Sequence, residues 1–225
     1  MKLSTDLSIK DLLLQDLSPG FIDELINQLN DTYLTAYDTS LGDPDLDKDQ
    51  ALYQLGYRRR ALAETSLKRT AIKFGLSCKT IQPKDGGCSH ISVSMGRFSL
   101  AMCHVQAPDA FPKYSVNREQ TSKVNQHISQ MSFWEEMPQQ IYGEEIFGII
   151  IHSGRSDKKA LRSIRVGIPN ADFTAWVQEP NCLFDLNQIL QRVISPEDDL
   201  QAEIQQAEPR LKKEMLGLVK SAKRE

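Results

Sequence analysis

A short stretch, Cys88–Val105, can be folded into a β-hairpin from its sequence alone. Gly96 and Arg97 form a two-residue loop, and glycine at the first loop position accepts the positive φ that tight hairpin turns need. This register places mostly apolar side chains on one face and small or polar side chains on the other. The hairpin therefore predicts where a core lies. The opposed pairs are Ser89 with His104, Ile91 with Met102, Val93 with Leu100, and Met95 with Phe98.

Two further segments are typical of strands, Ile146–His152 and Ser163–Ile168, whereas residues 1–75 carry apolar side chains at helical spacing. We therefore predict an α+β fold with a helical N-terminal half, a four-stranded antiparallel sheet of two hairpins, and C-terminal helices. The expected segments form one compact domain: helical residues 1–75, a sheet core with covering helices at 76–194, and a last helix at 195–225.

Composition narrows the class of protein. The net charge of −3 gives no overall attraction to nucleic acid or acidic membranes. No apolar run approaches the roughly 18 residues that span a bilayer, and the first residues lack the apolar segment of a secretory signal. Four cysteines in 225 residues are too few for a disulfide scaffold. We expect a cytoplasmic protein with reduced thiols and no membrane partner.

Positive charge is concentrated on the predicted helix over residues 50–74 and at the hairpin tip. Such a stripe can bind phosphates, which makes nucleic acid a candidate partner. The competing interpretation is a solvated helix face, or one paired with the many acids of the chain. The candidate nucleic-acid-binding residues are Arg58, Arg59, Arg69, Lys73 and Arg97.

A candidate metal site lies on the small-residue face of the hairpin. The register places His90 opposite Cys103, with Cys88 two residues away on the same face, so that the three side chains could share a zinc ion. Against zinc, the chain has no Cys-x-x-Cys pair, and buried cysteines often serve as small apolar residues. A zinc-stabilised module is therefore kept as an alternative.

Aromatic side chains gather after the last predicted strand, at Phe173, Trp176 and Phe184. Exposed Trp and Phe residues dominate many protein–protein contacts, so these three are candidate partner-binding residues. The competing interpretation is that they pack a long connection against the edge of the sheet.

Tests for catalytic motifs fail. The predicted central strands carry no Asp, Glu or Lys for a metal-dependent nuclease, and no Gly-x-Ser-x-Gly or His-Glu-x-x-His occurs. Only Cys103 with His90 could form a thiol–imidazole pair. We therefore predict a non-enzymatic binding or regulatory module that acts as a subunit of a protein complex, with a nucleic-acid-binding protein as the alternative. The partner's identity and the oligomeric state stay open.

Overall fold

The computed structural model describes residues 8–82, 89–129, 145–155 and 158–194. Contacts divide the chain into two units, Met1–Asn187 and Gln188–Glu225, and the whole sheet lies in the first unit. The helix predicted at 195–225 lies outside the described residues. None of the helices in the described part combines the length and the apolar character needed to cross a bilayer.

Three helices precede the sheet, as the helical spacing of the first residues predicts: α1 (Ile9–Asp16), α2 (Pro19–Leu41) and α3 (Lys48–Lys73). The first begins at a capping box in which the Ser8 hydroxyl accepts from the Asp11 amide, and the Asp11 carboxylate accepts from the Ser8 amide. Gly75, in the left-handed region at φ 67°, follows the end of α3 and lets the chain turn into the sheet.

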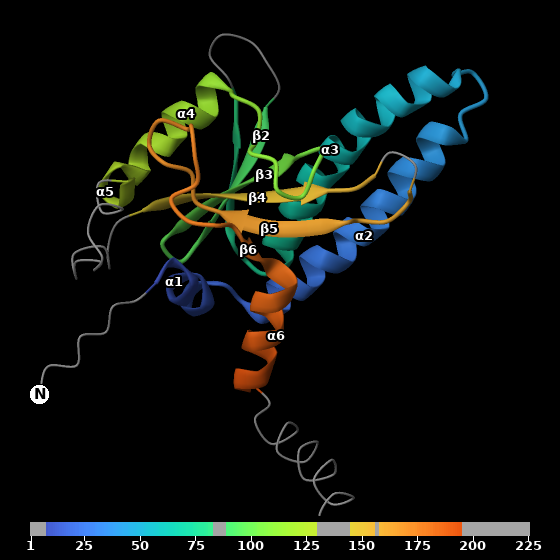
Figure 1. The fold of residues 1–225 in the computed structure, drawn as a ribbon. Coiled ribbons are helices and arrows are strands. Elements are labelled where there is room, and N and C mark those ends of the chain that lie inside the picture. Colours follow the sequence, from blue (N-terminus) through green and yellow to red (C-terminus); the bar gives the residue numbers. More distant parts are fainter. Residues whose placement is uncertain (1–7, 83–88, 130–144, 156–157, 195–225) are drawn as a thin grey trace, which may run out of the picture. The chain divides into compact units, whose positions relative to one another are not determined.

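The sheet has six strands and mixed direction, in the order β1-β2-β3-β4-β5-β6 (Figure 1). All neighbours are antiparallel except β3 and β4, which run parallel. The predicted four-stranded antiparallel sheet is therefore wrong. The strands are β1 (Ser77–Ile81), β2 (His90–Met95), β3 (Phe98–His104), β4 (Ile146–Ser153), β5 (Ser163–Gly167) and β6 (Asn181–Cys182).

The two additional strands lie at the edges of the sheet, where strand signals in sequence are weakest. β1 has no buried side chain, and β6 is two residues long, so neither shows the alternation that marks a half-buried strand. The parallel pair arises because a crossover of more than 40 residues separates β3 from β4. A connection of that length can carry the chain back to the starting end of the sheet, which a tight turn cannot do.

The hairpin of β2 and β3 confirms part of the predicted register. Val93 pairs with Leu100 and Met95 with Phe98, and Gly96 adopts a φ of 56° in the turn. All four apolar side chains are buried. α3 contacts β1, β2 and β3, and α2 packs alongside α3 (Figure 1). The apolar face is thus covered by helices, as predicted.

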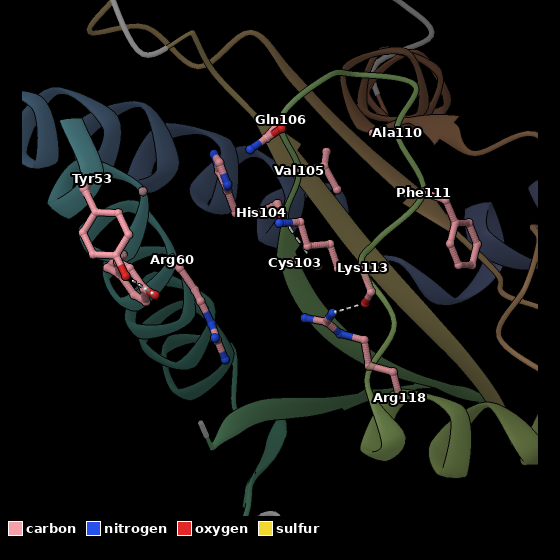
Figure 2. Close-up of a pocket in the computed structure, with 12 residues that line it drawn as sticks. Tyr53, Arg60, Cys103, His104, Val105, Gln106, Ala110, Phe111, Lys113 and Arg118 are labelled. Atoms are coloured by element: carbon pink, nitrogen blue, oxygen red, sulfur yellow. Dashed lines mark hydrogen bonds between the residues drawn. The ribbon is translucent and has the colours of Figure 1, made fainter. Parts of the chain in front are cut away.

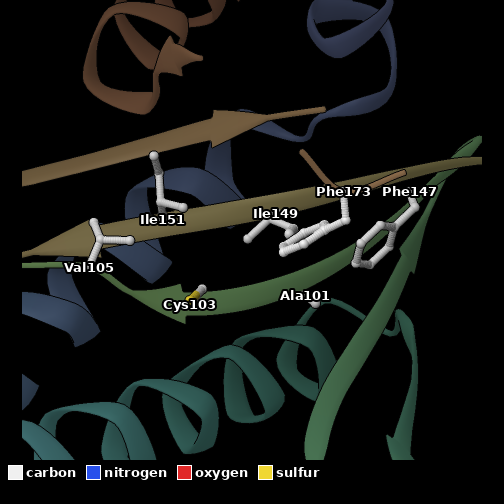
Figure 3. Packing of buried hydrophobic residues seen from close by; sticks show 7 residues of the cluster. All are labelled: Ala101, Cys103, Val105, Phe147, Ile149, Ile151 and Phe173. Carbon is white, nitrogen blue, oxygen red and sulfur yellow. The ribbon is translucent and has the colours of Figure 1, made fainter. Parts of the chain in front are cut away.

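The small-residue face is covered at β3 and β4. Its buried cluster consists of Ala101, Cys103, Val105, Phe147, Ile149, Ile151 and Phe173 (Figure 3). The crossover that packs on this side contains α4 (Val116–Ser122), η1 (Lys123–Asn125) and α5 (Gln126–Ser129). Asn125 holds it in place because its amide bonds both the N–H and the C=O of Phe147 and also the C=O of Pro169. The last described helix is α6 (Leu183–Ile194).

A buried polar cluster joins α2 and α3 to the sheet. The Tyr33 hydroxyl lies 2.8 Å from Nδ1 of His152 on β4. Arg59 of α3 is only 2% exposed, and its guanidinium carbon lies 4.6 Å from the centre of the Tyr33 ring. The same guanidinium donates to the carbonyls of Gly154, Arg155 and Lys158 at 3.2, 3.0 and 2.7 Å. Arg59 therefore fixes α3 against the connection between β4 and β5.

Replacing Arg59 with Ala should lower the free energy of unfolding by about 2–4 kcal/mol, because buried carbonyls lose a charged donor. Arg58→Ala on the same helix is the matched control, and it should change stability by less than about 0.5 kcal/mol. Urea denaturation followed by circular dichroism measures both. Equal losses in the two variants would contradict a special role for Arg59.

Candidate nucleic-acid interface

A groove runs between α3 and the segment that follows β3. One hollow of about 500 Å³ lies between α3, the end of β3 and the start of α4. Figure 2 shows Tyr53 and Arg60 on one side of this hollow and Lys113 and Arg118 on the other. A second hollow of about 550 Å³ shares Tyr57 and Arg60 with the first and continues along α3. We call the two together the α3 groove; its polar and aromatic lining includes Tyr53, Tyr57, Arg60, Glu64, Lys68, Lys113 and Arg118.

Helical spacing explains how α3 supplies most of this lining. Tyr53, Tyr57, Arg60, Glu64 and Lys68 follow one another at intervals of three or four residues, which places them along one stripe of the helix. The buried residues Leu55, Ala63 and Leu67 of α3 lie outside this stripe. One flank of α3 therefore packs in the core while the other lines the groove.

Two tyrosines form an exposed aromatic pair at one end of the groove. The side chains of Tyr53 and Tyr57 are 64% and 57% exposed, although both are large and largely apolar. Their ring centres lie 5.0 Å apart and their hydroxyl oxygens 3.0 Å apart. The hydrogen bond between the two hydroxyls raises the pKa of Tyr53, which keeps the Tyr53 ring uncharged at neutral pH. Their open ring surfaces are available for stacking.

Four cationic side chains line the α3 groove together with this pair: Arg60, Lys68, Lys113 and Arg118. Arg118 donates to the carbonyl of Lys113 at 2.9 Å, which connects α4 to the loop before it. Arg60 lies 3.4 Å from the Glu64 carboxylate and is partly exposed. Within the described residues, no ion pair holds Lys68 or Lys113. The groove therefore offers positive charge to a ligand.

The thiol–imidazole pair considered from the sequence has no activated thiol. Burial lowers the pKa of His90, and the charges of Arg118 and Arg60 lower it further. Burial also raises the pKa of the Cys103 thiol, and the same arginines only partly oppose this effect. Both groups are therefore neutral at neutral pH, and the thiolate that nucleophilic chemistry needs is not favoured.

The predicted nucleic-acid-binding residues are not brought together. Arg59 is buried in the polar cluster. Arg97 at the hairpin tip forms an ion pair of 2.7 Å with Asp16, and Lys73 forms one of 2.7 Å with Glu24. Arg58 and Arg69 lie on α3 but do not line the groove. The cations that line the groove are instead Arg60, Lys68, Lys113 and Arg118, none of which is among the predicted binding residues.

The three-residue metal site stays a prediction. Cys88 lies outside the described residues. Elsewhere in the described ranges, no three side chains of His, Cys, Asp or Glu come close enough to hold a metal ion. Cys103 packs in the apolar cluster with Ile149 and Ile151.

The candidate partner-binding residues differ in their surroundings. Phe173 is 3% exposed and packs within the buried cluster, so it has a packing role. Trp176 packs against Phe111 at 4.6 Å between ring centres and lies over Gly167, where a Cβ atom would clash with its ring. Phe184 is 40% exposed, the most exposed of the three.

Sequence reasoning missed Tyr53, Tyr57, Lys113 and Arg118. The two tyrosines carry a usable signal, because they stand four residues apart on a basic helix with Arg60 one turn further on. Lys113 and Arg118 reach the groove only through the path of the crossover, and nothing in the local sequence indicates that path.

Comparisons with protein-family models, with curated proteins and with solved structures find no match to this chain. The class of ligand is therefore inferred from the chemistry of the α3 groove.

The floor of the groove includes His104, whose ring lies 5.4 Å from that of His152. Burial, with a smaller contribution from Arg59, lowers the pKa of His104 to about 4. Burial, followed by His104 and Arg59, also lowers the pKa of His152 well below its ordinary value. Both rings are therefore neutral in the folded protein at neutral pH.

We expect acid to destabilise the protein through these histidines. In the unfolded chain they bind protons below about pH 6.5, whereas the folded protein resists protonation until lower pH. The free energy of unfolding should therefore fall as the pH drops from about 6.5 towards 4. His104→Gln should flatten this dependence, and urea titrations at several pH values measure both slopes. Parallel slopes in the two proteins would show that His104 does not contribute.

Proposed function

We propose that the protein binds single-stranded nucleic acid in the α3 groove. The observation that carries this proposal is the exposed Tyr53–Tyr57 pair set among four cationic side chains. Proteins that bind single strands combine positive charge, which follows the phosphates, with aromatic rings on which bases stack. Both components line the same groove here.

The exposed rings favour a single strand over a duplex. In a duplex the faces of the bases are stacked inside the helix, so that side chains meet phosphates and base edges. Unpaired bases instead present their faces, which can stack on tyrosine. An exposed tyrosine pair has no comparable partner on the surface of a duplex.

The length of the groove favours a chain of nucleotides over a single one. The lining on α3 runs from Tyr53 to Lys68, which at 1.5 Å per residue is about 22 Å along the helix axis. Two adjoining hollows along this distance give room for several consecutive nucleotides. Phosphates between them would meet Arg60, Lys68, Lys113 and Arg118 in turn.

The hypothesis of a protein-complex subunit stays a prediction. It rested in part on a small-residue face that a partner could approach, and the structure covers that face at β3 with Phe173 and the crossover. Phe184, which is 40% exposed, stays a candidate anchor for a partner. The α3 groove is consistent with such a subunit if the complex itself handles nucleic acid.

Arg60→Glu should weaken binding of a labelled oligonucleotide of about ten nucleotides at least tenfold, because it replaces a central phosphate contact with a repelling charge. Arg58→Glu makes the same charge change on the same helix outside the groove, and it should have a much smaller effect. Fluorescence anisotropy at several salt concentrations measures the affinities. The wild-type affinity should fall steeply with salt, and the slope should decrease in R60E.

Equal effects of the two Arg variants would indicate general charge attraction to α3 instead of a groove. Absence of binding at low salt, with both RNA and DNA strands, would refute the proposal. Circular dichroism spectra that match the wild type are required of each variant.

Stacking gives a separate test at Tyr57. Tyr57→Ala should weaken binding by about 1–3 kcal/mol, the usual contribution of one stacked base. Tyr57→Phe keeps the ring and should retain most of the affinity. The same anisotropy titration compares the two variants, and a loss in Tyr57→Phe as large as that in Tyr57→Ala would exclude stacking as the cause.

A further inference from the structure

One acidic side chain stands among the cations of the α3 groove. Of the described residues that line the two hollows, only Glu64 carries a carboxylate. Its side chain is 14% exposed, and burial raises the pKa of its carboxyl group, opposed by Arg60 and by the backbone N–H of Ile91. A carboxylate held in this position repels phosphates. If the groove bound phosphates by charge alone, Glu64 would therefore weaken binding.

The contact with Arg60 does not account for Glu64 by itself. The two side chains form an i,i+4 pair at 3.4 Å, and pairs of this kind stabilise a helix only weakly. An ionised carboxylate has about four acceptor positions, of which Arg60 and the Ile91 N–H occupy a part. The remaining acceptor capacity is open to donors on a ligand.

Among the common bases, guanine matches a carboxylate best. Its Watson–Crick edge presents two neighbouring donors, N1–H and the N2 amino group, which can meet both oxygens of one carboxylate. Adenine, cytosine and uracil each place an acceptor beside their donor, and that acceptor repels a carboxylate. Single strands leave these edges free for such readout.

We propose that the α3 groove prefers guanine in a single strand, and that Glu64 accepts hydrogen bonds from its Watson–Crick edge. This inference rests on the proposed function. In this arrangement Tyr57 and Arg60, which line the second hollow together with Glu64, hold the base and its phosphate while the carboxylate selects the base.

The test uses the full chain and three labelled oligonucleotides of about ten nucleotides, uniform except for a central guanine, inosine or adenine. Inosine keeps N1–H and lacks the N2 amino group. The wild type should bind the guanine strand about tenfold more tightly than the adenine strand, with inosine in between. RNA and DNA versions of each strand show whether the sugar matters.

Glu64→Gln should bind all three strands with similar affinity, no weaker than the wild type binds the adenine strand, because it removes a charge that repels phosphate. Asp31→Asn, the same neutralisation at an exposed position of α2, should keep the wild-type preference. If the wild type binds all strands equally, or if Glu64→Gln keeps the preference, the role of Glu64 is refuted while nucleic-acid binding stands. If no strand binds at all, the proposed function fails together with this inference.

Discussion

A buried guanidinium determines which side of α3 faces the groove. Arg59 donates to three carbonyls of the connection between β4 and β5 and lies over the Tyr33 ring, so its direction is fixed. At about 100° per residue, the stripe from Tyr53 to Lys68 then lies about 100–180° around the helix from Arg59. Arg58 and Arg69 lie on the opposite flank, at about 260–280°. Because Arg59 points into the protein, the stripe from Tyr53 to Lys68 lines the α3 groove, and Arg58 and Arg69 do not.

The part of the fold that follows from local chemistry could be predicted. Gly96 dictates the hairpin turn, and the alternation on either side of it fixes the pairs Val93–Leu100 and Met95–Phe98. The edge strands could not be predicted, because Ser77–Ile81 buries little and Asn181–Cys182 has no room for a pattern. The parallel pairing of β3 with β4 depends on the crossover, whose path is set by tertiary contacts such as those of Asn125 with Phe147.

The positions of the cationic side chains likewise depend partly on local sequence and partly on contacts between distant residues. The sequence reveals that α3 is basic, but each arginine finds its role through partners far along the chain. Arg97 is held by Asp16, 81 residues away, and Arg59 by carbonyls more than 90 residues away. The number of positive residues therefore predicts that the helix is charged, but it does not predict which side of the helix lines the groove. A rule that included exposed aromatic residues at i and i+4 would have directed attention to Tyr53 and Tyr57.

The buried polar cluster of Tyr33, Arg59 and His152 is connected to the lining of the α3 groove through His104. His104 lines the groove, contacts His152, and through it meets Tyr33, over which Arg59 lies. Tyr33 of α2 is bonded to His152 of β4, and Arg59 of α3 is bonded to the connection between β4 and β5, so these buried side chains fix both helices against the sheet. A groove with fixed walls loses little conformational entropy when a ligand enters, so more of the contact energy is retained as affinity. If the α3 groove binds nucleic acid as proposed, the buried polar cluster supports binding by fixing α3 against the sheet.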